Sequence, residues 1–282
     1  MRRLTFENAR GEDIVFYLSP LVIEELIGIG EVGAELQGQA VPYQDGELYA
    51  DTKLLPRYID LQGSITKTDL KDIKSYRKKI LRVCNPKLGL GKITLELDGD
   101  TKEIYGALDG VPSFPERGRR PFQPFMITWK CPNPYWRNPS QVSRSLRAYE
   151  GTFEFPFEFP IELGIEGDIT TLVNEGDTAT PVTISIQGPI DRPMIENRTT
   201  GQYMRVNVNL LENDVLFIDT DPLHKRVEIH RGNQIFKAMG YFEHSGDFWQ
   251  LQVGRNDIRV QAERGVRQAI AAISWHDMFT GM

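Results

Sequence analysis

The chain has 282 residues, a formal net charge of −6, and 40% hydrophobic and 26% charged residues, a composition typical of a soluble globular protein with one large or two ordinary domains. This length allows a sizeable core without disulfides or metal. The negative net charge argues against a protein that binds in a groove of nucleic acid. No apolar run is long enough to span a bilayer and the first residues lack the apolar core of a secretory signal, so we expect synthesis in the cytosol.

The first motif along the chain is Gly28-Ile29-Gly30-Glu31-Val32-Gly33, which matches the glycine spacing of dinucleotide-binding loops. Such a loop needs a strand before it and a helix after it, so that backbone N–H groups point at the pyrophosphate. Gly38 and Pro42 interrupt any helix here. We therefore interpret the stretch as a glycine-rich loop between strands, and we expect no cofactor.

One helix is predicted between residues 68 and 84. Apolar side chains recur there at helical spacing, namely Leu70, Ile73, Ile80, Leu81 and Cys84. Basic side chains cover the remaining surface, which favours a solvated helix face over a nucleic-acid site. Thr66 or Thr68 is expected to cap the start, and Asn85-Pro86 ends the helix.

A hairpin is predicted next, because two alternating runs between Ile93 and Tyr105 flank an Asp-Gly turn. Ile93, Leu95 and Leu97 form one apolar edge of this hairpin. Since an isolated two-stranded ribbon is marginal in water, the edge needs cover from its own domain or from a neighbouring subunit. We take these three residues as a candidate subunit interface.

A connector is predicted after Trp136, where residues 137 to 152 are polar and show little periodicity. It leads into a short duplication that two prolines keep extended. Four phenylalanines lie on one edge of this arm and must be buried against the chain's own domains or against a neighbour, which makes them further interface candidates: Phe153, Phe155, Phe157 and Phe159.

The second half is predicted to be a β-sandwich. Short runs of alternating apolar and polar residues are separated by frequent turn signals; the clearest runs are Val182–Ile186, Met204–Leu210 and Trp249–Val253.

Residues that could carry chemistry are scattered. The four histidines lack zinc-ligand spacing, and Cys84 and Cys131 are interpreted as buried thiols. Acid pairs at Asp219/Asp221 and Glu243/Asp247 lie in predicted turns, where aspartate bonds its own backbone. We therefore expect no catalytic, cofactor-binding or metal-binding residue, and no enzyme.

Taken in order, the segments resemble the siphovirus-type phage distal tail protein (Dit) family. The similarity covers nearly the whole chain and is densest after residue 172. The matching segments are the helix ending at Asn85-Pro86, Trp129–Trp136, Val173–Asp177, Ile186–Pro189, Pro193–Asn197, Trp249–Asn256, Ile273–Trp275 and Phe279–Met282.

The resemblance implies a mainly β protein of two domains. Residues 1–136 would form a ring-building, tube-protein-like β-sandwich with one α-helix and an extended hairpin. Residues 137–160 would be a linker with the Phe-rich arm, and residues 161–282 a galectin-like β-sandwich. We accordingly predict that the ring-forming contacts reside in the first domain.

The implied function is structural. The chain would form a homohexameric ring at the tail tip of a phage or prophage virion, joining the major tail tube protein to the tail-tip hub or a receptor-binding protein. Two alternatives stay open on sequence: a carbohydrate-binding host-adsorption module, which an exposed Trp249 would favour, and a glycosidase, which needs two acids facing across a groove.

Overall fold

The computed structural model describes residues 2–43, 45–66, 69–116, 118, 121–146, 169–265 and 269–282. It divides into two compact units, Met1–Pro139 with Phe279–Met282, and Ser140–Met278. Each unit has a hydrophobic core of its own. The Phe-rich arm with Phe153, Phe155, Phe157 and Phe159 lies outside the described residues, so its interface role stays a prediction.

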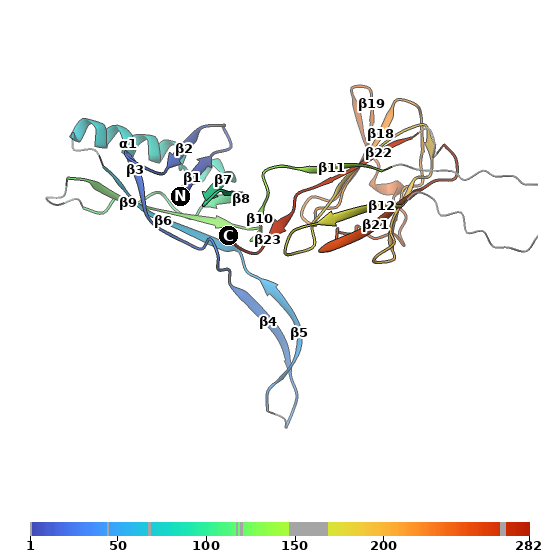
Figure 1. Ribbon diagram of the computed structural model, residues 1–282, viewed down its shortest axis with the longest axis horizontal. Helices are drawn as coiled ribbons and strands as arrows, with labels where there is room; N and C mark the ends of the chain where they lie inside the picture. Colours follow the sequence, from blue (N-terminus) through green and yellow to red (C-terminus); the bar gives the residue numbers. More distant parts are fainter. Residues whose placement is uncertain are drawn as a thin grey trace, which may run out of the picture. The chain divides into compact units, whose positions relative to one another are not determined.

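In its described residues, the first unit has one large sheet, in the order β2-β1-β7-β8-β9-β6-β3, one α-helix and a separate two-stranded ribbon, β4-β5 (Figure 1). Its elements are β1 (Arg2–Glu7), β2 (Asp13–Phe16), β3 (Leu21–Ile27), β4 (Ala34–Ala40), β5 (Glu47–Leu54), β6 (Arg57–Ile65), α1 (Leu70–Val83), the 3₁₀ helix η1 (Pro86–Leu88), β7 (Gly91–Leu97), β8 (Asp100–Leu108), β9 (Gln123–Cys131) and β10 (Trp136–Arg137).

Strict alternation of buried and accessible residues along β9 places one face of this strand in the core, as the period of two predicts. At its centre the rings of Phe6 and Trp129 are 5.5 Å apart. The hairpin predicted from the Asp-Gly pair is confirmed: β7 and β8 pair in register, and Asp98 and Gly99 both take the positive φ that such a tight turn requires.

Helix α1 is confirmed, but its start and its buried face differ from the prediction. Asp69 is the cap, and its carboxylate accepts a hydrogen bond from the Lys71 backbone N–H at 2.8 Å. The buried helix residues are Ile73, Ile80 and Val83. Leu70 and Leu81 are exposed, because the helix covers the sheet with a narrower stripe than the sequence pattern suggested.

Both cysteines are buried free thiols in the first unit, Cys84 at the end of α1 and Cys131 at the end of β9. Burial disfavours the thiolate and raises the pKa of each to about 12. Since the thiolate is the reactive form, we expect neither to react with a disulfide reagent at pH 8 in the folded protein, and both to react after unfolding. Rapid labelling of the folded chain would contradict this burial.

The second unit contains a six-stranded sheet, β11-β22-β13-β18-β19-β20, and a four-stranded sheet, β12-β21-β15-β16. Its elements are β11 (Val142–Leu146), β12 (Ile169–Asn174), β13 (Thr183–Gln187), β14 (Ile190–Asp191), β15 (Met194–Asn197), β16 (Gln202–Arg205), β17 (Asn209–Leu210), β18 (Asp214–Asp219), β19 (Arg226–Arg231), β20 (Gln234–Lys237), the 3₁₀ helix η2 (Met239–Tyr241), β21 (Gly254–Gln261) and β22 (Ile270–Trp275).

In each sheet a central strand, β18 or β21, buries every second residue, as expected of the predicted β-sandwich. Two strands were predicted too long. The run Met204–Leu210 is divided between β16 and β17. Trp249–Val253 contributes only an isolated bridge at Leu251, because Asn256 bonds both the N–H and the C=O of Gln252 and turns the chain there.

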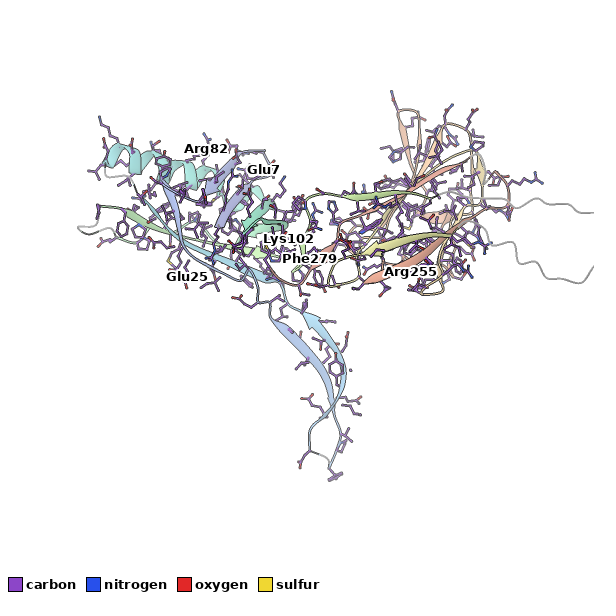
Figure 2. The ribbon with its side chains drawn as sticks, in the orientation of Figure 1. Glu7, Glu25, Arg82, Lys102, Arg255 and Phe279 are labelled. Atoms are coloured by element: carbon purple, nitrogen blue, oxygen red, sulfur yellow. The ribbon has the colours of Figure 1, made fainter. Side chains whose placement is uncertain are left out.

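After β22 the chain passes through β23 (Met278–Phe279) and returns to the first unit. The ammonium of Lys102 lies 4.0 Å from the centre of the Phe279 ring, a cation–π contact between two residues that Figure 2 labels. The sequence did not predict this return. In the described part of the chain, no helix is long and apolar enough to cross a membrane.

Candidate subunit interface

The β4–β5 ribbon is the most conspicuous surface feature of the first unit. It pairs only with itself, over the register Ala34↔Leu54 to Ala40↔Glu47, and it projects from the sheet on the side away from α1 (Figure 1). A two-stranded ribbon of this kind is at best marginally stable alone in water. We therefore expect the ribbon to be stabilised by contact with another protein surface.

Large apolar side chains stand exposed along the ribbon, whose side chains project away from the sheet of the first unit in Figure 2. Leu36 is 74% exposed, Leu48 64% and Tyr49 67%. The Tyr49 hydroxyl bonds Thr52 Oγ1 at 2.9 Å, so these two side chains share one face. Because monomeric proteins seldom gather exposed apolar side chains in one place, the ribbon is a candidate protein–protein interface.

The root of the ribbon is fastened by one buried cation, Arg57 at the start of β6. Its guanidinium donates to the carbonyl oxygens of Gly28 and Glu31, each at 2.8 Å, on the chain that leads into β4. It also donates to Pro134 O at 2.8 Å and to Thr280 O. Burial lowers the pKa of Arg57. The four carbonyl oxygens accept hydrogen bonds from its guanidinium N–H groups and so replace the water that burial removes.

Neighbouring groups complete this root. The Trp136 indole N–H donates to Ile29 O at 3.0 Å, and the Met282 N–H donates to the same oxygen at 3.1 Å. Hydrogen bonds from the backbone N–H groups of Glu31 and Gly28 hold the pKa of the Glu31 carboxyl below its ordinary value. These hydrogen bonds fix the position of the residues from which the ribbon leaves the sheet.

The glycine pattern predicted as a loop forms part of this base. Gly28 has a φ of +84°, and a Cβ there would lie 1.8 Å from Tyr58 O, so only glycine fits. The segment after Gly33 is strand β4 and not a helix. The arrangement that a dinucleotide loop needs is therefore replaced by a strand.

The sequence-predicted interface at the β7–β8 hairpin needs correction. Ile93 and Leu95 are fully buried in the core of their own unit, between β1 and β8, and Leu97 is half-buried. The apolar side chains of this hairpin are thus buried within their own subunit. The exposed ribbon is instead β4–β5, for which no strands were predicted.

A signal for the ribbon did exist in the sequence. Asp45-Gly46, a turn dipeptide, lies between two runs of seven and eight residues that became β4 and β5. The first run was missed because Leu36 is the one large apolar side chain among its alternating small and polar residues. Strands that bury neither face carry no such pattern.

The groups proposed as alternatives for chemistry are held in local contacts. Glu243 accepts from Ser245 and Tyr203 and pairs with Arg205, and these hydrogen bonds lower its pKa, which is opposite to what a general acid needs. Asp219 pairs with Arg226 at 3.1 Å. Among the described residues, no group of histidine, cysteine and carboxylate side chains could hold a metal ion.

The tryptophans of the second unit are also accounted for. Trp249 is 1% and Trp275 3% exposed, and both lie in the core of the sandwich. A sugar-binding face generally presents an aromatic side chain on its surface, so neither of these two indoles serves that purpose.

Comparison with known families gives two matches in chain order. Residues 9–131 match the model of the family described as the phage tail protein RIFT-related domain. Residues 175–279 match that of the siphovirus-type tail component, C-terminal domain. Together the two matches span about four fifths of the chain. No curated protein matched.

Solved structures share the fold over the full length. The crystal structure of the SPP1 Dit protein, described as a paradigm of the hub adsorption apparatus in phages that infect Gram-positive bacteria, is 14% identical, with a TM-score of 0.71 over 98% of this chain and 99% of that one. A chain of the phage P2 baseplate in its activated conformation with Ca is 8% identical, with a TM-score of 0.55 over 100% of both chains.

Proposed function

This chain belongs to the siphovirus-type distal tail (Dit) protein family, and from that premise we propose that it forms a closed ring at the tip of a phage tail. Its function is that of a structural distal tail component of the virion. The observation that carries the ring proposal is the exposed ribbon β4–β5, fixed at its root and uncovered along its length.

The proposed ring is a homohexamer built by the first unit. A closed ring needs a heterologous contact, in which one patch of a subunit meets a different patch of the next. The ribbon supplies one such patch on a rigid base. The sandwich of the second unit is proposed to be galectin-like and to take no part in ring closure.

We further propose that the ring connects the major tail tube protein on one side with the tail-tip hub or a receptor-binding protein on the other. The SPP1 relative is described as part of a hub adsorption apparatus, and the P2 relative comes from a baseplate, which supports partners of this kind. Synthesis in the cytoplasm of the host bacterium and the absence of catalysis are parts of the same proposal.

The test is the mass of the purified full-length chain by light scattering. The chain has a mass of 32.2 kDa, so six copies give about 190 kDa. A mass of a single chain at tens of micromolar, in physiological salt, would contradict the ring.

A further inference from the structure

We propose that the acidic ribbon β4–β5 of one subunit docks on the basic face of helix α1 of the next copy of this chain, so that this contact closes the ring. The inference rests on the proposed ring and names the surface that the ribbon meets. It is carried by charge, length and placement within the first unit.

The ribbon is acidic. Between Ala34 and Leu54 it carries four acidic side chains and one basic one; the acids are Glu35, Asp45, Glu47 and Asp51. All are exposed, and none forms an ion pair with another described residue. Glu35 and Asp51 share one face, because the register pairs Glu35 with Lys53 and Gln37 with Asp51.

Helix α1, in contrast to the ribbon, is basic. In a chain of net charge −6, the 14 residues Leu70–Val83 carry six basic side chains and one acidic one. Lys71, Lys74, Lys78 and Arg82 recur three and four residues apart, on the side of the helix opposite its buried residues. All four are exposed, and only Arg82 has an ion-pair partner among the described residues, Glu12 at 3.4 Å.

The two surfaces match in size and in apolar content. A helix of 14 residues is about 21 Å long, and the eight residues of β5 extend over about 26 Å. Leu70 and Leu81 stand exposed beside the lysines. On the ribbon, the exposed Leu48 pairs with Gln39 and so lies on the face of Glu35 and Asp51. An interface between them would therefore combine apolar contact with opposite charges.

The placement suits a head-to-tail contact. Figure 1 shows the ribbon and α1 on opposite sides of the sheet of the first unit, so one subunit cannot use both surfaces on itself. Each copy can offer its ribbon to one neighbour and its helix to the other. This is the heterologous geometry that rotation closes into a ring.

Charge reversal in the full-length chain tests the docking. The helix variant is Lys74→Glu with Lys78→Glu, and the ribbon variant is Glu35→Lys with Asp51→Lys. Each alone places like charges opposite each other, and we expect ring affinity to fall on the order of a hundredfold. Mixed in equal amounts, the two variants should recover the ring, because alternating copies restore every contact.

The control is a matched charge reversal in the second unit, Lys225→Glu with Lys237→Glu. It changes the net charge of the chain as much as the helix variant does and should leave the ring mass unchanged. Wild-type affinity should also fall as salt rises. Melting temperatures near that of the wild type would show that the variants fold.

The outcomes separate the two proposals. A wild-type chain that remains monomeric overturns the ring itself. A ring that withstands the helix variant, or two defective variants that fail to recover on mixing, overturns only the docking. Loss of duplex DNA binding in the helix variant, with an unchanged ring, would assign the basic face to nucleic acid and overturn it as well.

Discussion

Replacing residues 34–54 with an Asn-Gly turn is expected to convert the ring into single chains. The ends are already adjacent, since the Leu55 N–H donates to Gly33 O at 2.8 Å, so a tight turn can close the gap. The deletion removes the exposed apolar and acidic side chains of the ribbon and leaves the core untouched. Light scattering should report one chain, while the melting temperature of the first unit stays within about 3 °C of the wild type.

A milder pair of variants separates apolar contact from chain length. Leu36→Ser with Tyr49→Ser should weaken the ring strongly, because interface aromatic residues carry a large share of binding energy. The matched control is Ile235→Ser with Phe236→Ser on β20 of the second unit, which are also exposed. A ring that tolerated the deletion would show that the ribbon is not the contact.

Arg57→Ala is expected to be the most destabilising single substitution at the root of the ribbon. It removes the cation that satisfies carbonyl oxygens of Gly28, Glu31, Pro134 and Thr280 and leaves them buried without that donor. Losing one partner of a buried charged network costs about 3–5 kcal/mol. Hydrogen exchange of the β6 amides should measure this loss within the first unit alone.

Two control variants show whether the loss of stability comes from the buried hydrogen bonds of Arg57. Arg226→Ala removes a half-exposed arginine from its pair with Asp219 and should cost less than about 1 kcal/mol. Arg57→Lys keeps the charge but cannot direct donors to four acceptors, so we expect an intermediate loss. Equal stability of Arg57→Ala and Arg226→Ala would mean that Arg57 does not hold the root.

Amphipathic elements were predictable from the sequence, and the reason is physical. A strand or helix that buries one face leaves a period of two or 3.6 in its residues, and so β7–β8, α1 and the second-unit sandwich were predicted. The boundaries of α1 shifted because capping by Asp69 depends on local geometry rather than on periodicity.

The interface was harder to predict, because the sequence shows which residues prefer burial but not what buries them. Ile93 and Leu95 looked like an uncovered edge and are covered by β1 and β8 of the same sheet. Strands β4 and β5 are exposed on both faces, so apart from the Asp45-Gly46 turn their sequence held no strong apolar signal. Arg57 was invisible for a related reason: its four acceptors lie up to 223 residues away in the chain.

The most direct test of the central claim is negative-stain electron microscopy of the purified full-length protein. A distal tail ring predicts round particles with a central hole, six-fold symmetric in class averages, at concentrations where light scattering reports the assembled mass. Compact particles without a hole, unchanged over the concentration range in which a ring should form, would contradict it.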